Sequence, residues 1–267
     1  MAARSLDLRG LPDGLHRVPH GEDRPLLVKR RRGAPVGFFA AEALGLALLA
    51  AAGGLRVPEV FEVAQGWLVL EDLGRGVPAP DAWRRAGAAL ARQHACRGAS
   101  FGLDRDGWCG DGPQANTPCE DGWRFFAERR LLPQARRARD ARLLGSRDVA
   151  DIEALCGRLP ALLPPQPPVL LHGDLWSGNL HTCGDGELAL IDAAAAHYGW
   201  AEADLAMLTL FGAPPAAFFH AYQDASEIDR GWRARVPLYN LYHLLNHLNL
   251  FGSGYLPQVR AATARYL

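Results

Sequence analysis

The chain has 267 residues, of which 49% are hydrophobic, and its 29 basic and 29 acidic residues leave no formal net charge at pH 7. That composition is typical of a globular protein with one large domain or two modest ones. Without a net positive charge, the chain lacks the electrostatic field that attracts nucleic acid or an anionic membrane, so we expect neither as a partner and favour a small molecule.

The cysteines and the N-terminal residues indicate a reducing compartment. The cysteines are odd in number and include no CxxC pair, which argues against a disulfide framework and against a zinc site. Residues 1–7 include charges and lack the apolar run of a secretory signal, and the longest apolar run, 40–55, is too short and interrupted to span a membrane. We therefore expect a soluble, cytoplasmic protein, with a monomer favoured. The five cysteines are Cys96, Cys109, Cys119, Cys156 and Cys183.

The first elements predict a lysine and a glutamate that can meet in space. Residues 23–29 form a predicted short strand ending at Lys29, and residues 38–49 form an Ala/Leu-rich helix with Glu42 in its first turns. An ion pair between the two side chains would hold the lysine on nucleotide phosphates. The alternative is a pair of solvated surface charges, which is common and weak.

Two more strands are predicted at 57–63 and 66–74, so the first seventy-odd residues should form a small sheet with one helix. A Pro/Gly-rich stretch, 74–80, then marks the expected lobe boundary, and a helix follows over 82–94. Residues 98–122 contain many glycines and predict a long, ordered loop.

The remaining chain is predicted to be mainly helical. A helix begins at Trp123 and continues through a basic face at 136–142, which we interpret as solvated. A long helix is expected over 232–250, with leucines at core spacing. His243 and His247 lie four residues apart on it and are able to hold a metal. However, no HEXXH motif and no neighbouring cysteine or acidic residue completes a site, so a core or interface role is favoured.

The most informative stretch places three oxygen-bearing side chains after two short apolar runs, 170–171 and 188–191. Asp174 is suited to orient and deprotonate a hydroxyl, the amide oxygen of Asn179 to hold a divalent cation, and Asp192 to bridge cations to nucleotide phosphates. The triplet at 172–174 alone is also consistent with a simple turn. Asp192 favours catalysis, because a carboxylate at the edge of a buried strand needs a partner or a metal.

These residues and others along most of the chain resemble the fructosamine kinase/ketosamine-3-kinase family, whose fold is similar to that of protein kinases and aminoglycoside phosphotransferases. The last blocks separate this family from other small-molecule kinases of the same fold. The resemblance is found at residues 27–29, 42–46, 56–58, 68–71, 101–102, 113–116, 125–131, 172–179, 198–199, 202–207, 210–212 and 238–252.

The resemblance implies an α+β, two-lobed, protein-kinase-like fold. Residues 1–74 would form the small N-terminal lobe, an antiparallel sheet plus one helix that binds nucleotide. Residues 75–267 would form the larger, mainly helical lobe for catalysis and substrate. ATP would bind between the lobes and give its γ-phosphate to the O3 hydroxyl of a ketosamine, carried by a small molecule or a protein. The phosphorylated adduct is unstable, which implies a role in deglycation.

The resemblance also implies roles for individual residues. Asp174 would be the catalytic base, Asn179 and Asp192 the Mg²⁺ ligands, and Lys29 the phosphate-positioning cation with Glu42 as its partner. The resemblance assigns two further groups of residues: a hinge that offers backbone groups to adenine, and residues that face the substrate. The hinge comprises Glu71, Asp72 and Leu73, and the substrate-side residues are Trp176, His172 and Asn116, with plain core packing as the alternative for Trp176.

Two departures from the family pattern leave other functions open. The family usually has Asp-Pro-Ala at the metal-binding aspartate, where this chain has alanines at 193–196, and residues 10–14 are a compressed substitute for the phosphate-covering hairpin. One alternative is another small-molecule phosphotransferase of this fold, acting on an aminoglycoside, choline or homoserine hydroxyl. The other is a non-catalytic ATP-binding module.

Overall fold

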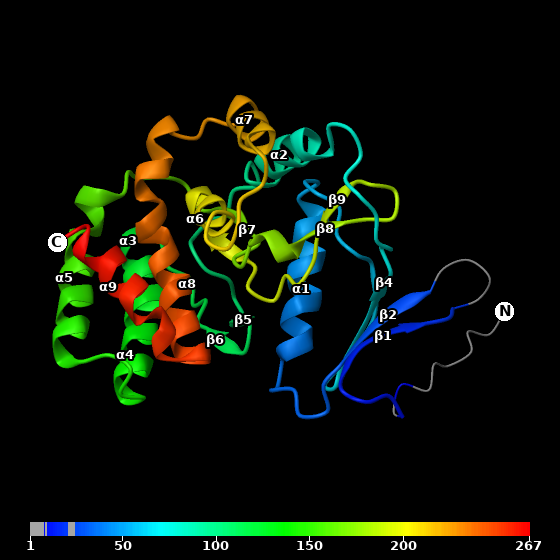
Figure 1. Ribbon diagram of the computed structural model, residues 1–267, viewed down its shortest axis with the longest axis horizontal. Helices are drawn as coiled ribbons and strands as arrows, with labels where there is room; N and C mark the ends of the chain where they lie inside the picture. Colours follow the sequence, from blue (N-terminus) through cyan, green and yellow to red (C-terminus); the bar gives the residue numbers. More distant parts are fainter. Residues whose placement is uncertain (1–7, 9, 21–24) are drawn as a thin grey trace.

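An antiparallel sheet forms the N-terminal end of the molecule, opposite the C-terminal helices (Figure 1). The computed structural model describes residue 8, residues 10–20 and residues 25–267. The expected absence of a secretory signal at residues 1–7 and the expected strand start at 23–24 therefore lie outside the described residues. The strand order in the sheet is β1-β2-β4-β3. The four strands are β1 (Gly14–Val18), β2 (Leu26–Arg30), β3 (Val60–Ala64) and β4 (Trp67–Glu71).

Strand β2 places Lys29 at the inner side of this sheet. It pairs with β1 on one side and β4 on the other, with Lys29 opposite Leu15 and Leu68. Leu26 and Val28 are buried, so the alternation of a strand directs Lys29 to the other face. Helix α1 (Phe38–Ala51) follows β2, and the predicted sheet with one helix is thereby confirmed.

The rest of the described chain is mainly helical, with three short two-stranded pairings. The strands pair as β5 (Gly107–Cys109) with β6 (Gly112–Gln114), β7 (Val169–Leu171) with β10 (His197–Gly199), and β8 (Leu180–Thr182) with β9 (Leu188–Leu190). The α-helices are α2 (Ala82–Gln93), α3 (Gly122–Phe125), α4 (Leu132–Asp140), α5 (Ser146–Leu162), α6 (Ala201–Met207), α7 (Ala216–Asp224), α8 (Val236–Phe251) and α9 (Leu256–Ala264). A π-helix spans Phe126–Leu131, and 3₁₀ turns span Ser177–Asn179, Arg230–Arg235 and Ser253–Tyr255.

Three details differ from the sequence-based expectations. The segment 98–122 is not wholly a loop, because β5 and β6 form a hairpin within it. The helix after Trp123 passes through a π-helical turn, and its Arg130 is 2% exposed, whereas the solvated face begins farther along. The last long helix starts as a 3₁₀ turn and becomes α-helical at Val236, where Pro237 fits the first turn because it has no N–H to lose.

The hydrophobic core joins the N-terminal sheet to the segments around β7, β8 and β9. One cluster unites Leu46 of α1 and Leu68 of β4 with Leu90 of α2 and Leu190 of β9, and therefore crosses the expected boundary at residue 74. Gly45 lets α1 approach the chain after β9, because a Cβ there would overlap the carbonyl oxygen of Ala193. A second cluster packs the C-terminal helices together. No helix in the described part of the chain is long and apolar enough to cross a bilayer.

Candidate active site

The loop that carries Asp174 is held by a buried carboxylate. Asp204 on α6 accepts hydrogen bonds from the backbone N–H groups of His172 (2.7 Å) and Gly173 (2.9 Å), and its Oδ2 lies 3.3 Å from Nε2 of His94. Burial alone would raise the pKa of Asp204, but these bonds and the neighbouring histidines outweigh it and lower the pKa. Gly173 has φ 82° and faces the carbonyl of Ala195, so only glycine fits there.

Replacing Asp204 by alanine should destabilise the fold by about 2–5 kcal/mol, because two buried N–H groups and an imidazole would lose their acceptor. Urea unfolding measures the difference in the free energy of unfolding. The exposed Asp224 is the control, and Asp224→Ala should change stability by less than about 0.5 kcal/mol. Equal effects of the two substitutions would contradict the structural role of Asp204.

Five predicted polar residues line one pocket of about 490 Å³ between the sheet and the helical part of the chain. That volume is within the range of small-molecule sites. The pocket is bordered by Phe38, Phe39, Trp108, Gly110, Asp111, Trp176, Ala194, Leu250 and Phe251. The five polar residues are Lys29, Glu42, Asp174, Asn179 and Asp192.

Lys29 and Glu42 form the predicted ion pair, with Nζ and Oε1 2.6 Å apart. The Glu42 side chain is only 5% exposed and that of Lys29 19%, which excludes the alternative of two solvated surface charges. Nζ of Lys29 also contacts Oδ1 of Asp192, whose side chain is about half exposed. The ammonium group thus lies between a buried carboxylate and one that faces the pocket.

Asn179 and Asp192 present oxygen atoms that suit a hard divalent cation. The Asn179 amide donates a hydrogen bond from Nδ2 to the carbonyl oxygen of Asp174 (2.9 Å), which fixes the amide and leaves Oδ1 as the possible ligand. Asp192 has φ 61°, a left-handed conformation that non-glycine residues adopt rarely. The donor set fits Mg²⁺ better than a softer metal.

Asp174 lies at the bottom of the pocket, with its side chain 18% exposed. Burial raises its pKa above the ordinary aspartate value, while the charges of His172 and His247 act in the opposite direction. A carboxylate with a raised pKa and access to the pocket is suited to accept a proton from a bound hydroxyl.

The predicted hinge is fixed mainly through side chains. Glu71 pairs with Arg56, and Asp72 pairs with Arg17 and accepts from the Gly74 N–H (2.8 Å). The carbonyl oxygen of Leu73 accepts a hydrogen bond from the Gly184 N–H (2.8 Å), which ties the hinge to the turn between β8 and β9.

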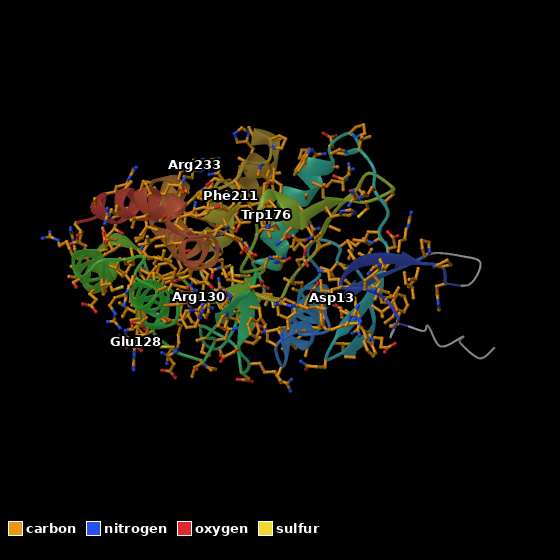
Figure 2. The ribbon with its side chains drawn as sticks, turned by 60° about the horizontal axis from the view of Figure 1, so that its bottom comes forward. Asp13, Glu128, Arg130, Trp176, Phe211 and Arg233 are labelled. Carbon is orange, nitrogen blue, oxygen red and sulfur yellow. The ribbon has the colours of Figure 1, made fainter. Side chains whose placement is uncertain are left out.

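The three residues expected on the substrate side have different positions. Trp176 is 38% exposed, lines the pocket and meets Phe211 edge to face at 6.4 Å, so it is not core (Figure 2). His172 is fully buried and its Nε2 lies 2.8 Å from the carbonyl oxygen of Ile191. Asn116 is also fully buried and accepts from Nη2 of Arg130 (2.7 Å). The structure thus does not bring His172 and Asn116 to the pocket.

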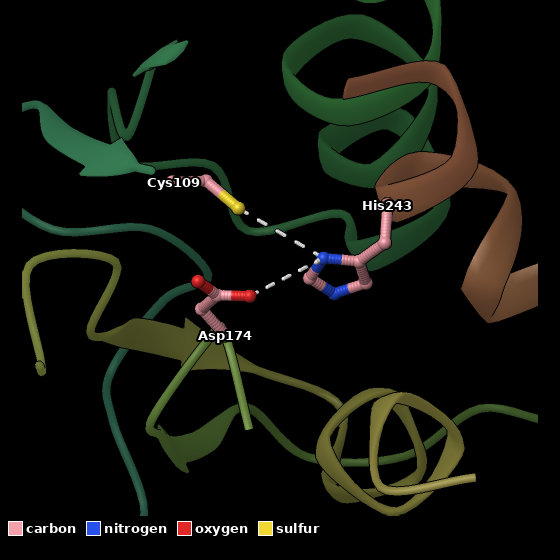
Figure 3. A group of neighbouring side chains, drawn as sticks. All are labelled: Cys109, Asp174 and His243. Carbon is pink, nitrogen blue, oxygen red and sulfur yellow. Dashed lines mark hydrogen bonds and ion pairs between the residues drawn. The ribbon is translucent and has the colours of Figure 1, made fainter. Parts of the chain in front are cut away.

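Sequence reasoning missed two neighbours of Asp174. Nδ1 of His243 lies 3.9 Å from Oδ1 of Asp174, and Sγ of Cys109 lies 3.9 Å from the same Nδ1 (Figure 3). The expectation that His243 has no cysteine or acidic partner holds along the sequence but is wrong in space. Its buried position, which was expected, is confirmed. Spacing along the chain gave no signal for these contacts.

The segment at residues 10–14 leads into β1 and has Leu8 beneath it in a small core. Asp13 accepts a hydrogen bond from the backbone N–H of Arg32 (2.9 Å), which ties this segment to the turn after β2.

A family model and two similar relatives indicate the same protein family. The family model described as fructosamine kinase matches residues 15–267. A probable ketoamine kinase of Synechocystis is 44% identical over 231 residues, covering 84% of this chain and 76% of the relative. The chloroplastic protein-ribulosamine 3-kinase of Arabidopsis thaliana is 34% identical over 253 residues, covering 90% of this chain and 75% of the relative.

Solved structures agree with the sequence comparison. The crystal structure of a protein assigned as a fructosamine-3-kinase from Thermobifida fusca superposes with a TM-score of 0.86 at 40% identity, covering 94% of this chain and 88% of that one. A choline/ethanolamine kinase family protein from Mesorhizobium loti has a TM-score of 0.58 at 19% identity, covering 96% and 87%. The second likeness concerns the fold alone, which is protein-kinase-like, as the sequence resemblance implied.

Proposed function

This chain belongs to the fructosamine kinase family and is a kinase-type phosphotransferase, and from that premise we propose that it transfers the γ-phosphate of ATP to the O3 hydroxyl of a ketosamine. The observation that carries the proposal is the meeting of Asp174, Asn179, Asp192 and the Lys29–Glu42 pair in one pocket. These are the groups that phosphoryl transfer requires, and they come from distant parts of the chain.

In the proposed reaction the protein mainly positions groups and stabilises charge. Asp174 accepts the proton of the attacking hydroxyl. Lys29, held by Glu42, orients the nucleotide phosphates. Asn179 and Asp192 hold Mg²⁺, which neutralises charge on the phosphates when bound. Residues 71–73 bind adenine between a nucleotide lobe, 1–74, and a substrate lobe, 75–267.

His172 and Asn116 take a positioning role in this proposal rather than direct contact with the sugar. Nδ1 of His172 lies 3.3 Å from the backbone nitrogen of Asp174, so the imidazole shapes the turn that presents the base. Asn116 lies in the segment before α3 and holds it to Arg130 through a hydrogen bond, outside the pocket that contains Asp174. Both side chains are fully buried.

Trp176 is proposed to pack against the sugar, because its ring is partly exposed beside Asp174 and already supported by Phe211. Trp176→Ala should raise KM for the ketosamine about tenfold with a smaller change in KM for ATP, since roughly 1.4 kcal/mol of contact would be lost. Steady-state kinetics with each substrate varied measures both constants. Phe61→Ala is the control, because Phe61 is similarly exposed but lies on β3. A Trp176 variant with unchanged KM would contradict sugar packing.

An assay of ADP release across ribulosyl-lysine, fructosyl-lysine, choline, homoserine and an aminoglycoside tests the proposed function. We expect turnover with the two ketosamines only. NMR of the product should show phosphorus coupled to the proton on C3, and incubation should then release the amine, as deglycation requires. Turnover confined to another alcohol would overturn the ketosamine assignment, and no turnover on any substrate would favour an ATP-binding module.

A further inference from the structure

Cys109, Asp174 and His243 form a compact group at the bottom of the pocket (Figure 3). Cys109 ends β5, Asp174 follows β7, and His243 lies on α8, so the fold joins three distant segments here. Their side chains point toward one another, and one ligand atom from each lies within 4.8 Å of the others. Cys109 and His243 are 134 residues apart along the chain, so spacing in the sequence does not reveal this group.

The distances are close to those of a zinc centre. Zinc binds thiolate, imidazole and carboxylate atoms at about 2.0–2.3 Å, which places tetrahedral ligands about 3.3–3.8 Å from one another. Here Nδ1 of His243 is 3.9 Å from Sγ of Cys109 and 3.9 Å from Oδ1 of Asp174. Because all three atoms lie within 4.8 Å of one another, an ion would draw the side chains slightly closer together. Of the three residues, Asp174 lines the pocket.

The chemistry of the three groups selects a thiophilic cation. Burial lowers the pKa of His243 to about 3, so its imidazole is neutral and its nitrogen lone pair is available. Burial raises the pKa of the Cys109 thiol well above its usual value, so a binding ion must displace the proton, which leaves to solvent. Zn²⁺ does this readily, whereas Mg²⁺ prefers oxygen ligands. One thiolate and one carboxylate then neutralise the dication.

We propose that Cys109, Asp174 and His243 form an inhibitory Zn²⁺ site. The bound ion would coordinate the Asp174 carboxylate and so prevent it from accepting the substrate proton. The ion enters from the pocket, which Asp174 lines together with Trp108 and Gly110 on either side of Cys109. The site uses neither Asn179 nor Asp192 as a ligand. Binding of the ion rests on the geometry and donor chemistry of the three side chains, and its inhibitory effect rests on the proposed function of Asp174.

Cobalt binding tests the site without reference to activity. The full chain, kept reduced with a phosphine and in excess Mg²⁺, should bind one Co²⁺ with a thiolate-to-cobalt absorption band in the near ultraviolet, and Zn²⁺ should displace it. Cys109→Ser and His243→Ala should lose the band. Cys156→Ser should keep it, because Cys156 lies on α5 and does not belong to the cluster. Absence of the band in the unsubstituted protein would overturn the site, as would its persistence in Cys109→Ser.

Inhibition is measured as the rate of ADP release with saturating Mg²⁺-ATP and ketosamine, and each protein is compared with itself in the absence of Zn²⁺. Micromolar Zn²⁺ should lower the rate of the unsubstituted chain and of Cys156→Ser at least about tenfold, and that of Cys109→Ser less than about twofold. Cobalt binding without zinc inhibition would overturn the inhibitory role. A cobalt band in a protein inactive on every ketosamine would instead count against the proposed function and leave the metal site supported.

Discussion

Replacing Asp174 by asparagine should lower kcat for ketosamine phosphorylation by about a hundredfold or more, since an amide cannot accept the hydroxyl proton and general bases contribute roughly 10²–10⁴. The side chain keeps its size, so the fold should be retained. ADP release under saturating substrate measures the loss, and the melting temperature verifies folding. Turnover within a few-fold of the unsubstituted chain would show that Asp174 is not the base.

Asp111 is the matched control for this substitution. Its carboxylate lines the same pocket, but its side chain is 66% exposed and pairs with Arg31 on the sheet side. Asp111→Asn should change kcat less than about threefold, because exposed ion pairs contribute little. A comparable loss in both variants would indicate a general effect of pocket charge instead of a specific base.

The pH dependence of kcat/KM gives an independent test of Asp174. Burial raises its pKa, so the protonated, inactive form persists to higher pH than for an exposed aspartate. Activity should therefore rise as pH increases through the raised pKa, with the acid limb above the ordinary aspartate range. The residual activity of Asp174→Asn should lack that limb. A limb that remains in this variant would assign the titration to another group.

The parts of the site that sequence predicted are those whose signals are local. Asp174 and Asp192 each follow a short apolar run that predicts a buried strand, so both carboxylates are expected at strand ends. Asn179 lies five residues after Asp174, in the 3₁₀ turn before β8. Lys29 and Glu42 were paired because a strand and the next helix are neighbours in space. The strands of the N-terminal sheet were predicted from short runs of apolar residues bounded by turn residues, which are also local signals.

The parts that sequence missed depend on partners far along the chain. The imidazole of His172 is held in the interior by the carbonyl oxygen of Ile191, and Asn116 is held there by Arg130. These partners lie 19 and 14 residues away, so the motif positions of His172 and Asn116 did not reveal their burial. Cys109 and His243 are 134 residues apart, and their contact follows from the β5–β6 hairpin packing on α8. That hairpin was hidden in a glycine-rich stretch without strand periodicity.

Replacing Asp192 by asparagine should remove most of the activity and most of the stabilisation by Mg²⁺-ATP. Asparagine tolerates the left-handed backbone at this position, where φ is 61°, so the substitution changes charge with little strain. Asp192→Ala would add strain and serves as the comparison for that effect. The loss in kcat should be about a hundredfold or more, because a metal-binding carboxylate is removed from the phosphates.

Ligand-induced stabilisation separates the metal role of Asp192 from its contact with Lys29. A ligand present at about a hundred times its Kd stabilises the fold by about 2.7 kcal/mol, so Mg²⁺-ATP should raise the melting temperature of the unsubstituted chain clearly. In Asp192→Asn that rise should be much smaller, whereas ATP with EDTA should shift both proteins alike. If Asp192 acted only by pairing with Lys29 in the free protein, its removal would release the ammonium for phosphate. The ATP-induced shift would then increase, which is the result opposite to the one that metal binding requires.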